Sequence, residues 1–293
     1  MRAELPSETK PSLGIIGHLA IDEIVHPILG VRSLPGGSAA AVATASVQTG
    51  VVTSIYSKVG KDFSSEWLSV LENLGIDISK VEISDKDESL KVKIIYDEKG
   101  NKELIECSDA VSSNLAIKIL PRAEGIHICP IKPQEQMELV QRLKGHSDIL
   151  SLNLSEYFID DYKKEDFFAK LNWQYLDLVF ANEKEAGTLT GLDKPEDMAS
   201  IFHSEGVDLA VITLGSKGSL VYDGRNMHYM NANEVTVVDT TGCGDSYIGG
   251  FLGDYLISKD AKKAAGMGTY FASLTAQKKG SWAALVSDVG YRF

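Results

Sequence analysis

Cysteine is scarce in this sequence of 293 residues, and Cys107, Cys129 and Cys243 lie far apart without a C-x-x-C pair. An odd number of scattered cysteines argues against both a disulfide framework and a zinc site. The sequence also lacks any run of 18 apolar residues, and its first ten residues are polar rather than shaped like a secretion signal. We therefore expect a protein of a reducing compartment, the cytoplasm, with no membrane partner.

Positive charge is also limited, because 29 lysine and arginine residues stand against 41 acidic residues and give a formal net charge of −12. Such a surface does not suit the phosphates of nucleic acids or an anionic lipid surface. Any phosphate group that the protein binds must therefore be held locally. Apolar residues make up 44% of the chain, which is enough for a large buried core.

The first half of the chain opens with a strand, a helix and a second strand. The apolar run Leu13–Ile21 is typical of a buried strand, the small residues 38–48 suit a helix, and Val51–Val59 suits the next strand. Segments 91–96 and 103–107 alternate like a partly exposed hairpin. We interpret this hairpin as an excursion from the main sheet.

From residue 125 onward, strands and helices alternate in a pattern that predicts a mostly parallel sheet with helices on both faces. Strands are expected near 126–129, 149–154, 178–181, 209–214, 219–222 and 235–238, and helices near 134–143 and 163–171. A last helix follows residue 245, where apolar residues recur on one face from Tyr247 to Leu256. No repeat or linker interrupts the pattern, so we expect a single domain over residues 1–293.

The segment Asp239-Thr240-Thr241-Gly242-Cys243-Gly244-Asp245 lies between the last predicted strand and that helix. Glycines at a helix N-terminus let an anion approach backbone amides that have no partner within the helix. The same amides should keep the Asp245 carboxylate ionised. That carboxylate would repel a bound phosphate unless a hydroxyl lay between them. The pattern therefore predicts phosphoryl transfer, with Asp245 as the base and the amides of Gly242, Cys243 and Gly244 as an anion hole.

A tight turn whose aspartate caps the helix would produce the same short pattern, and this interpretation stays open for the loop alone. Two other nucleotide-binding loops are excluded. A Rossmann loop G-x-G-x-x-G would need glycine at the position of Tyr247, and no Walker sequence G-x-x-x-x-G-K-[ST] occurs.

Four segments together resemble the ribokinase-like, or pfkB-type, carbohydrate kinase family. The loop 239–245 is similar to the family signature D-T-x-G-A-G-D, Gly36-Gly37-Ser38 to its diglycine motif, Asn182-Glu183-Lys184-Glu185 to N-x-x-E, and Gly215-Ser216-Lys217-Gly218 to its nucleotide-side loop. The resemblance spans nearly the whole chain. It implies a three-layer α/β/α sandwich with a mostly parallel central sheet, and a small β lid formed by roughly residues 22–37 and 83–107.

The resemblance also implies roles for individual residues. Asp22, Gly36, Gly37 and Asn153 would bind the substrate, although a plain turn asparagine is the alternative for Asn153. Asn182 and Glu185 would position Mg²⁺ through water, and a helix cap made by the same pair is an equally sound interpretation. ATP would contact Asn182, Glu185, Thr213, Gly215, Lys217, Gly218, Thr241 and Ser273. A monovalent cation beside the anion hole and a homodimer formed through the lid are further expectations.

Two departures from the family pattern bear on the substrate. Ala41 stands where the family commonly has an asparagine that contacts sugar hydroxyls, and Cys243 replaces the usual alanine of the anion loop. Residues 17–24, 62–80 and 244–247 look most like archaeal nucleoside kinases, which favours a nucleoside 5′-hydroxyl as the acceptor. A sugar or inositol kinase of the same family is the alternative, and a non-catalytic nucleoside- or sugar-binding sensor is a third.

Overall fold

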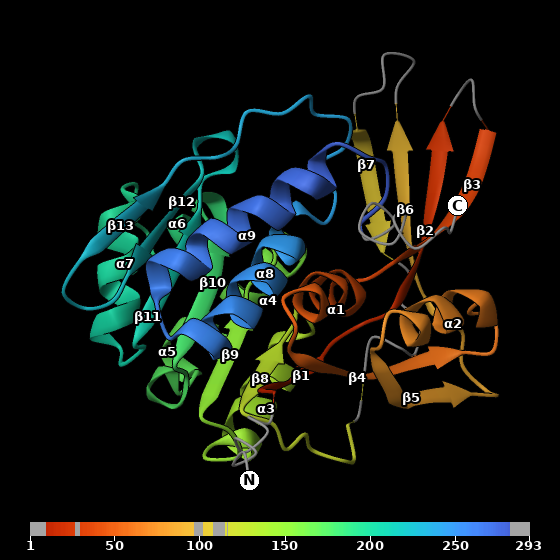
Figure 1. Ribbon diagram of the computed structural model, residues 1–293, viewed down its shortest axis with the longest axis horizontal. Helices are drawn as coiled ribbons and strands as arrows, with labels where there is room; N and C mark the ends of the chain where they lie inside the picture. The colour runs from red at the N-terminus through yellow and green to blue at the C-terminus, as the bar shows by residue number, and fades with distance from the viewer. Residues whose placement is uncertain (1–9, 27–29, 97–101, 108–114, 116, 282–293) are drawn as a thin grey trace, which may run out of the picture.

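The computed structural model describes residues 10–26, 30–96, 102–107, 115 and 117–281 (Figure 1). The strands are β1 (Ser12–Ile16), β2 (Ala20–His26), β3 (Gly30–Gly36), β4 (Val52–Gly60), β5 (Asp77–Ser84), β6 (Leu90–Tyr96), β7 (Lys102–Cys107), β8 (Gly125–Ile128), β9 (Ile149–Asn153), β10 (Leu178–Asn182), β11 (Leu209–Thr213), β12 (Ser219–Tyr222) and β13 (Met227–Met230). In these ranges the large sheet has the order β13-β12-β11-β10-β9-β8-β1-β4-β5, and the small sheet has the order β3-β2-β6-β7. The large sheet is parallel except at β12, which runs opposite to both of its neighbours.

Helices cover both faces of the large sheet. They are α1 (Ser38–Gln48), α2 (Ser65–Asn73), α3 (Pro133–Leu143), α4 (Ile159–Lys164), α5 (Phe167–Lys170), α6 (Glu183–Thr190), α7 (Pro195–Ser204), α8 (Cys243–Ser258) and α9 (Ala261–Ala276). Within β1, Ile15 belongs to the core under α1 and α8, whereas Ile16 belongs to the core under α3 and α7. Successive strand residues thus bury opposite faces. The predicted three-layer α/β/α arrangement is confirmed. No helix in the described ranges is both long and apolar enough to cross a membrane.

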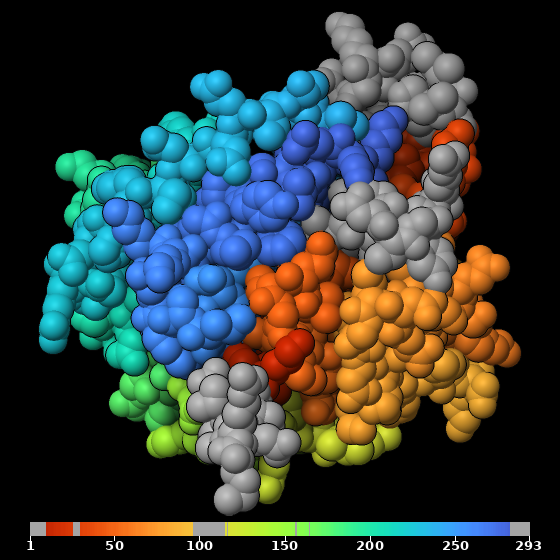
Figure 2. Space-filling view, viewed as in Figure 1, coloured from red at the N-terminus to blue at the C-terminus, as the bar shows by residue number. Residues whose placement is uncertain are grey.

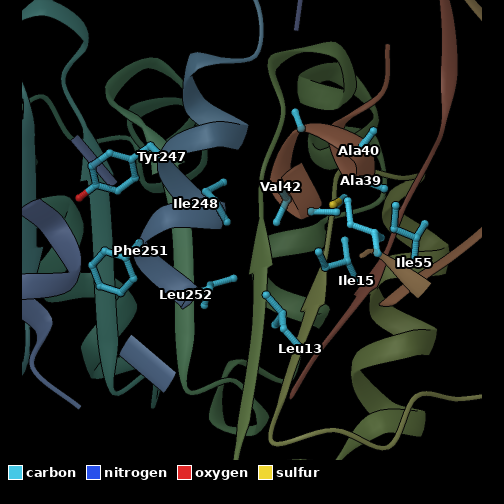
Figure 3. Close-up of a cluster of buried hydrophobic side chains, with 14 of the residues drawn as sticks. Leu13, Ile15, Ala39, Ala40, Val42, Ile55, Tyr247, Ile248, Phe251 and Leu252 are labelled. Carbon is cyan, nitrogen blue, oxygen red and sulfur yellow. The ribbon is translucent and has the colours of Figure 1, made fainter. Parts of the chain in front are cut away.

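Small residues allow α1 and α8 to lie close together. A Cβ atom at Gly249 would lie 2.2 Å from the carbonyl oxygen of Val42, and one at Gly253 would lie 2.2 Å from Oγ1 of Thr49. Figure 3 shows Val42 beside Ile248 in this interface, and Figure 2 shows the surfaces of the two helices in contact. This close packing fixes the position of the α8 N-terminus relative to the sheet.

The run Leu13–Ile21 forms two strands rather than the single strand that its composition predicts. β1 ends at Ile16, and β2 begins at Ala20 and pairs within the small sheet. Between them Gly17 lies against Cys129, where a Cβ atom at position 17 would be only 2.5 Å from the Cys129 Cβ. β1 after Ser12 and the first three residues of β2 are buried, so the apolar pattern alone does not reveal where the chain changes sheets.

Two further predictions are wrong. Residues Val235–Val238 form no strand, and the backbone meets the end of α9, where the Val238 amide donates to the carbonyl oxygen of Ala276 at 2.7 Å. The helix predicted near 163–171 is two short helices, because Asp166 has a left-handed φ of 52° that interrupts the helical backbone.

The small sheet stands to one side of the helices and the large sheet (Figure 1). β2 is antiparallel to β3 and parallel to β6, and β6 and β7 form the predicted antiparallel hairpin. The second segment of this sheet begins at Leu90, since Ile83 lies in β5 and pairs with Val59 in the large sheet. Because β2 follows β1 after three residues, the small sheet is anchored where the central strands end.

Candidate active site

A cavity of about 610 Å³ lies where the central parallel strands end. Its walls come from the ends of β9, β10 and β11, the segments after β1 and β8, the start of α8, and β6 of the small sheet. Open α/β sheets bind their ligands at this carboxyl edge. Of the residues predicted for the site, the cavity brings together Gly37, Asn153, Asn182, Glu185, Thr213, Gly242, Gly244 and Asp245.

The loop before α8 has two glycines with different surroundings. Gly242 has a left-handed φ of 77°, and a Cβ atom there would lie 2.4 Å from the carbonyl oxygen of Ser281, so only glycine fits. At Gly244 a Cβ atom would have no heavy atom within 4 Å, which leaves room for an anion. The Cys243 amide donates to the carbonyl oxygen of Thr240 at 3.2 Å. Gly242 and Gly244, rather than Cys243, therefore line the cavity.

Asp245 lies in the first turn of α8, half-buried at the cavity wall. Burial raises the pKa of its carboxyl group to about 7. The expectation that the helix N-terminus keeps this group fully ionised is wrong, because removal from water outweighs the attraction of the backbone amides. A pKa near neutrality suits a general base, which must accept a proton and release it again.

Asn182 and Glu185 form a reciprocal cap at the start of α6. The Asn182 side-chain oxygen accepts from the Glu185 amide at 2.8 Å, and Glu185 Oε2 accepts from the Asn182 amide at 2.8 Å. This capping box confirms the structural interpretation of the pair. Both residues also line the cavity, so a cap and a contact with a ligand are compatible.

The diglycine motif joins the small sheet to α1. A Cβ atom at Gly36 would lie 2.1 Å from Oδ1 of Asp22, so this buried carboxylate lies directly on the glycine backbone. Gly37 has a φ of 98° at the N-cap of α1, where a Cβ atom would lie 2.4 Å from the carbonyl oxygen of His18. Asp22 and Gly36 adjoin the cavity through Gly37 without lining it.

The other predicted nucleotide contacts lie outside the cavity lining, and they are Gly215, Lys217, Gly218, Thr241 and Ser273. Gly215 and Lys217 are exposed in a short turn that follows Thr213. Thr241 instead stabilises the loop, since its amide and hydroxyl both donate to Asp239 Oδ1, at 3.0 and 2.8 Å.

Sequence reasoning missed several cavity residues, among them His18, Leu90, Val92, Lys132, Tyr157 and Phe158. His18 is 6% exposed, and its buried Nδ1 has no hydrogen-bond partner in the described part of the chain. Burial, and then the charge of Lys132, lower the pKa of His18 to about 4, so the ring is neutral. Of these residues, Lys132 could have been identified most easily as a site residue from the sequence. It is a single charged residue between Pro130 and Pro133, just after a predicted strand.

Within the described ranges, no group of three or more His, Cys, Asp and Glu side chains is placed to hold a metal ion. A Mg²⁺ ion in this cavity would therefore take few oxygen ligands from the protein and the rest from water and phosphate, as Mg²⁺ does beside nucleotides. Asn182 and Glu185 supply side-chain oxygens at the cavity wall and fit that arrangement.

The cavity can support one kind of chemistry well. The carboxyl group of Asp245 can take a proton from an alcohol, while the open backbone at Gly244 and the N-terminus of α8 stabilise negative charge on a transferring group. Phosphoryl transfer needs positioning and charge stabilisation more than covalent chemistry from the protein. The fold and the cavity thus define a kinase that phosphorylates an alcohol.

The chain belongs to the pfkB family of carbohydrate kinases, whose pattern it matches over residues 19–287. It is 33% identical over 280 residues to the cytidine kinase of Thermococcus kodakarensis, covering 94% of this chain and 99% of that protein. It is 27% identical over 282 residues to the nucleoside kinase of Methanocaldococcus jannaschii, covering 90% of each chain. The predicted family and the predicted kinase activity are confirmed, and the family implies ATP as the phosphoryl donor.

Solved structures confirm the fold. The crystal structure of the Methanocaldococcus jannaschii nucleoside kinase matches with a TM-score of 0.80 and 26% identity, covering 95% of this chain and 98% of that one. The ribokinase of Thermotoga maritima matches with a TM-score of 0.78 at 20% identity, covering the same shares, which supports the fold alone.

Proposed function

We propose that this kinase transfers the γ-phosphoryl group of ATP to the 5′-hydroxyl of a nucleoside. The observation that carries the proposal is the placement of the Asp245 carboxyl group in a cavity that also has apolar and aromatic walls, from Leu90, Val92, Tyr157 and Phe158. A free sugar has little apolar surface to bury, whereas a nucleoside has a flat base for such walls. The similarity to nucleoside and cytidine kinases over nearly the whole chain supports the same acceptor.

The strand order suggests how the two substrates share the cavity. The strands β11, β10, β9, β8 and β1 are neighbours in this order. The first three end at Thr213, Asn182 and Asn153, and the last two are followed by Lys132 and His18. At about 4.8 Å per strand, the row spans roughly 19 Å, enough for a triphosphate followed by an acceptor. We place the triphosphate at the β11 and β10 end. The nucleoside then lies at the β8 and β1 end, beside the small sheet.

In the proposed reaction, Asp245 accepts the proton of the 5′-hydroxyl as the hydroxyl oxygen attacks the γ-phosphorus. The bond from the γ-phosphorus to the β,γ-bridging oxygen breaks, and ADP leaves. The amides at Gly242 and Gly244 stabilise the charge on the transferring group. Asn182 and Glu185 hold Mg²⁺ through water, and the small sheet acts as a lid that excludes water, which would compete as acceptor. Gly37, which lines the cavity, binds the ribose, and Asp22 and Gly36 support it from the adjoining position.

An acceptor screen tests this function. ATP consumption is measured with nucleosides, pentoses, hexoses, inositol and phosphosugars, each with Mg²⁺ present. We expect turnover with at least one nucleoside at a kcat/KM that is at least about tenfold above that of any sugar. Faster turnover with inositol or a hexose would assign the alternative sugar or inositol kinase function, and tight nucleoside binding without turnover would assign a sensor.

Asp245→Asn tests the base. The amide keeps the size and polarity of the side chain but cannot accept the proton, so we expect kcat to fall about 10³-fold. Nucleoside binding, measured by calorimetry, should change less than about threefold. Wild-type turnover by this variant would show that Asp245 is not the base.

Three further proposals rest on the family resemblance. The exposed edge strand β3, with Val31 66% exposed, suits pairing of two small sheets in a homodimer. Sedimentation showing only the 31.8 kDa monomer at micromolar concentration would contradict it.

A monovalent cation beside the anion loop predicts faster turnover in K⁺ than in a large organic cation. The cytoplasmic location stays a prediction that cell fractionation can check.

A further inference from the structure

A chain of buried polar side chains lies directly beneath the cavity. His127 of β8 is fully buried and pairs with Ser151 of β9 in the parallel register. Its Nδ1 lies 2.9 Å from Ser151 Oγ, and its Nε2 lies 3.1 Å from Oδ1 of Asn153. Of these three residues, only Asn153 lines the cavity. The chain of hydrogen bonds therefore ends on a residue of the site.

The protonation of His127 determines the direction of these bonds. Burial lowers the pKa of His127 to about 3, so the ring is neutral and carries a single N–H. The Asn153 side-chain oxygen can only accept, which places that N–H on Nε2. The bare Nδ1 then accepts from the Ser151 hydroxyl. That hydroxyl also lies 3.2 Å from the carbonyl oxygen of Ile126, but its one proton is used in the shorter contact.

The backbone of Asn153 is held separately. Its carbonyl oxygen accepts from Gln136 Nε2 at 3.0 Å, and Gln136 Oε1 in turn accepts from the Tyr162 hydroxyl at 3.1 Å. These bonds fix the Asn153 backbone but not its side-chain amide. The orientation of that amide is set by the hydrogen bond to His127. With Oδ1 on the imidazole, the amide nitrogen Nδ2 remains, and within the described part of the chain it makes a long contact of 3.4 Å with the carbonyl oxygen of Leu154. Nδ2 carries two hydrogens, so one is left for a ligand of the cavity that Asn153 lines. The side chain therefore presents a donor to the cavity.

Packing alone does not explain a histidine at this place. The neighbouring positions in β8 and β9 are the buried apolar residues Ile126, Ile128, Leu150 and Leu152. Buried hydrogen-bonded groups contribute little net stability compared with apolar groups of the same shape. Apolar residues at positions 127, 151 and 153 together would therefore serve the core about as well, and the polar chain is not required by packing.

We propose that His127 is a positioning residue, which holds the amide group of Asn153 toward the cavity as a hydrogen-bond donor to the γ-phosphoryl group. The proposal rests on the proposed function, because the group that Asn153 meets is the one that ATP transfers. An amide donor is complementary to a phosphate oxygen, whereas the reversed amide would point Oδ1 at that oxygen and repel it. His127 itself touches no substrate.

A double-mutant cycle tests the proposal through kcat. His127→Leu keeps the volume but lets the Asn153 amide rotate, so kcat should fall about 10- to 100-fold with the nucleoside KM nearly unchanged. Asn153→Ala should lose about as much. Because His127 acts only through Asn153, the double variant should be no slower than Asn153→Ala alone. Losses that multiply in the double variant would overturn the proposal, as would a wild-type kcat in His127→Leu.

Two matched variants separate positioning from folding. His127→Gln can still donate to Asn153 and accept from Ser151, so its kcat should stay within about threefold of wild type. Asn153→Asp presents only acceptors, so it should be slower than Asn153→Ala. A His127→Gln variant as slow as His127→Leu, or an Asn153→Asp variant faster than Asn153→Ala, would count against the proposal.

A binding measurement keeps the test independent of the acceptor. Calorimetry compares a non-hydrolysable ATP analogue with ADP, which lacks the γ-phosphoryl group. His127→Leu should weaken the analogue about tenfold and leave ADP unchanged. If no acceptor is phosphorylated but this difference is seen, the proposed function fails and the positioning role stands. Equal binding of the analogue to wild type and variant would sink the positioning role even if nucleosides are phosphorylated.

Discussion

Asp245 is subject to two opposing influences. The N-terminus of α8 favours its ionised form, whereas burial favours its neutral form, and the pKa of about 7 shows that burial prevails. When substrates bind, a hydroxyl brought next to the carboxylate can replace part of the lost hydration. The group is therefore poised between its two protonation states near neutral pH.

This pKa makes stability depend on pH. Between the unfolded value of 3.8 and the folded value of about 7, the folded chain keeps a proton that the unfolded chain has lost. Asp245 thus makes its full contribution to the free energy of unfolding below pH 3.8, and this contribution is lost as the pH rises from 3.8 to about 7. Asp245→Asn removes this loss. We expect the variant to be more stable than wild type by about 2 kcal/mol at pH 8. This is about half of the free energy that the full pKa shift corresponds to, because the group borders a cavity where water screens its charge.

Urea denaturation at pH 5 and pH 8 measures this difference, which should shrink toward the lower pH. Asp254→Asn, at a half-buried position of the same helix that does not line the cavity, is the matched control. A difference that is equal at both pH values would contradict the raised pKa. In the enzyme assay, kcat/KM for the acceptor should rise with pH through about 7, because only the ionised base accepts a proton.

At the scale of elements, one side chain at the start of α6 has two roles. Glu185 caps the helix, and it is also proposed to hold Mg²⁺. Glu185 is 7% exposed and caps the helix through Oε2. Glutamine at this position keeps an oxygen that can accept the same hydrogen bond but removes the negative charge. Alanine removes both.

We expect Glu185→Ala to lower the free energy of unfolding by about 1 kcal/mol, the usual contribution of a cap, while Glu185→Gln stays within a few tenths of wild type. Both variants should need about tenfold more Mg²⁺ for half-maximal turnover, because the ion loses a carboxylate partner. Thermal unfolding and a Mg²⁺ titration of activity measure the two effects. A Gln variant with wild-type Mg²⁺ dependence would remove Glu185 from the proposed metal site.

At the scale of the whole molecule, the acceptor site depends on both sheets. The small sheet contributes Leu90 and Val92 to a cavity whose other walls come from the large sheet and α8. The small sheet is tied to the core where β2 follows β1, where β3 leads into α1, and where β6 follows β5. Movement of one sheet relative to the other would open and close the acceptor end.

Leu90→Ala should raise the acceptor KM about tenfold, because the loss of three apolar carbons weakens binding by roughly 1 to 2 kcal/mol. The dissociation constant of ADP should not change, since the nucleotide is placed at the opposite end of the cavity. Ile83→Ala removes the same number of carbons from a side chain that is 58% exposed on β5, and it should leave both constants unchanged. Equal effects on acceptor and ADP would contradict the proposed division of the cavity.

Sequence reasoning succeeded where the signal is local and failed where it depends on partners. The helix after Asp245 and the capping box at Asn182 were predicted correctly, because their periodicity and spacing are written in a few adjacent residues. The break of Leu13–Ile21 into two sheets was missed, since both halves are buried and read as one apolar run. Val235–Val238 has a strand-like composition, but its backbone bonds to the end of α9 instead.

The alternation of strands and helices in the second half, the loop from Asp239 to Asp245 and the family were determined by the sequence itself, because each depends on short-range chemistry of adjacent residues. Tertiary structure alone decided the pKa of Asp245, the electrostatic effect of Lys132 on His18, and the hydrogen bond from His127 to Asn153. These depend on burial and on contacts between strands far apart in the chain. No local pattern encodes how much water a side chain loses when distant elements pack around it.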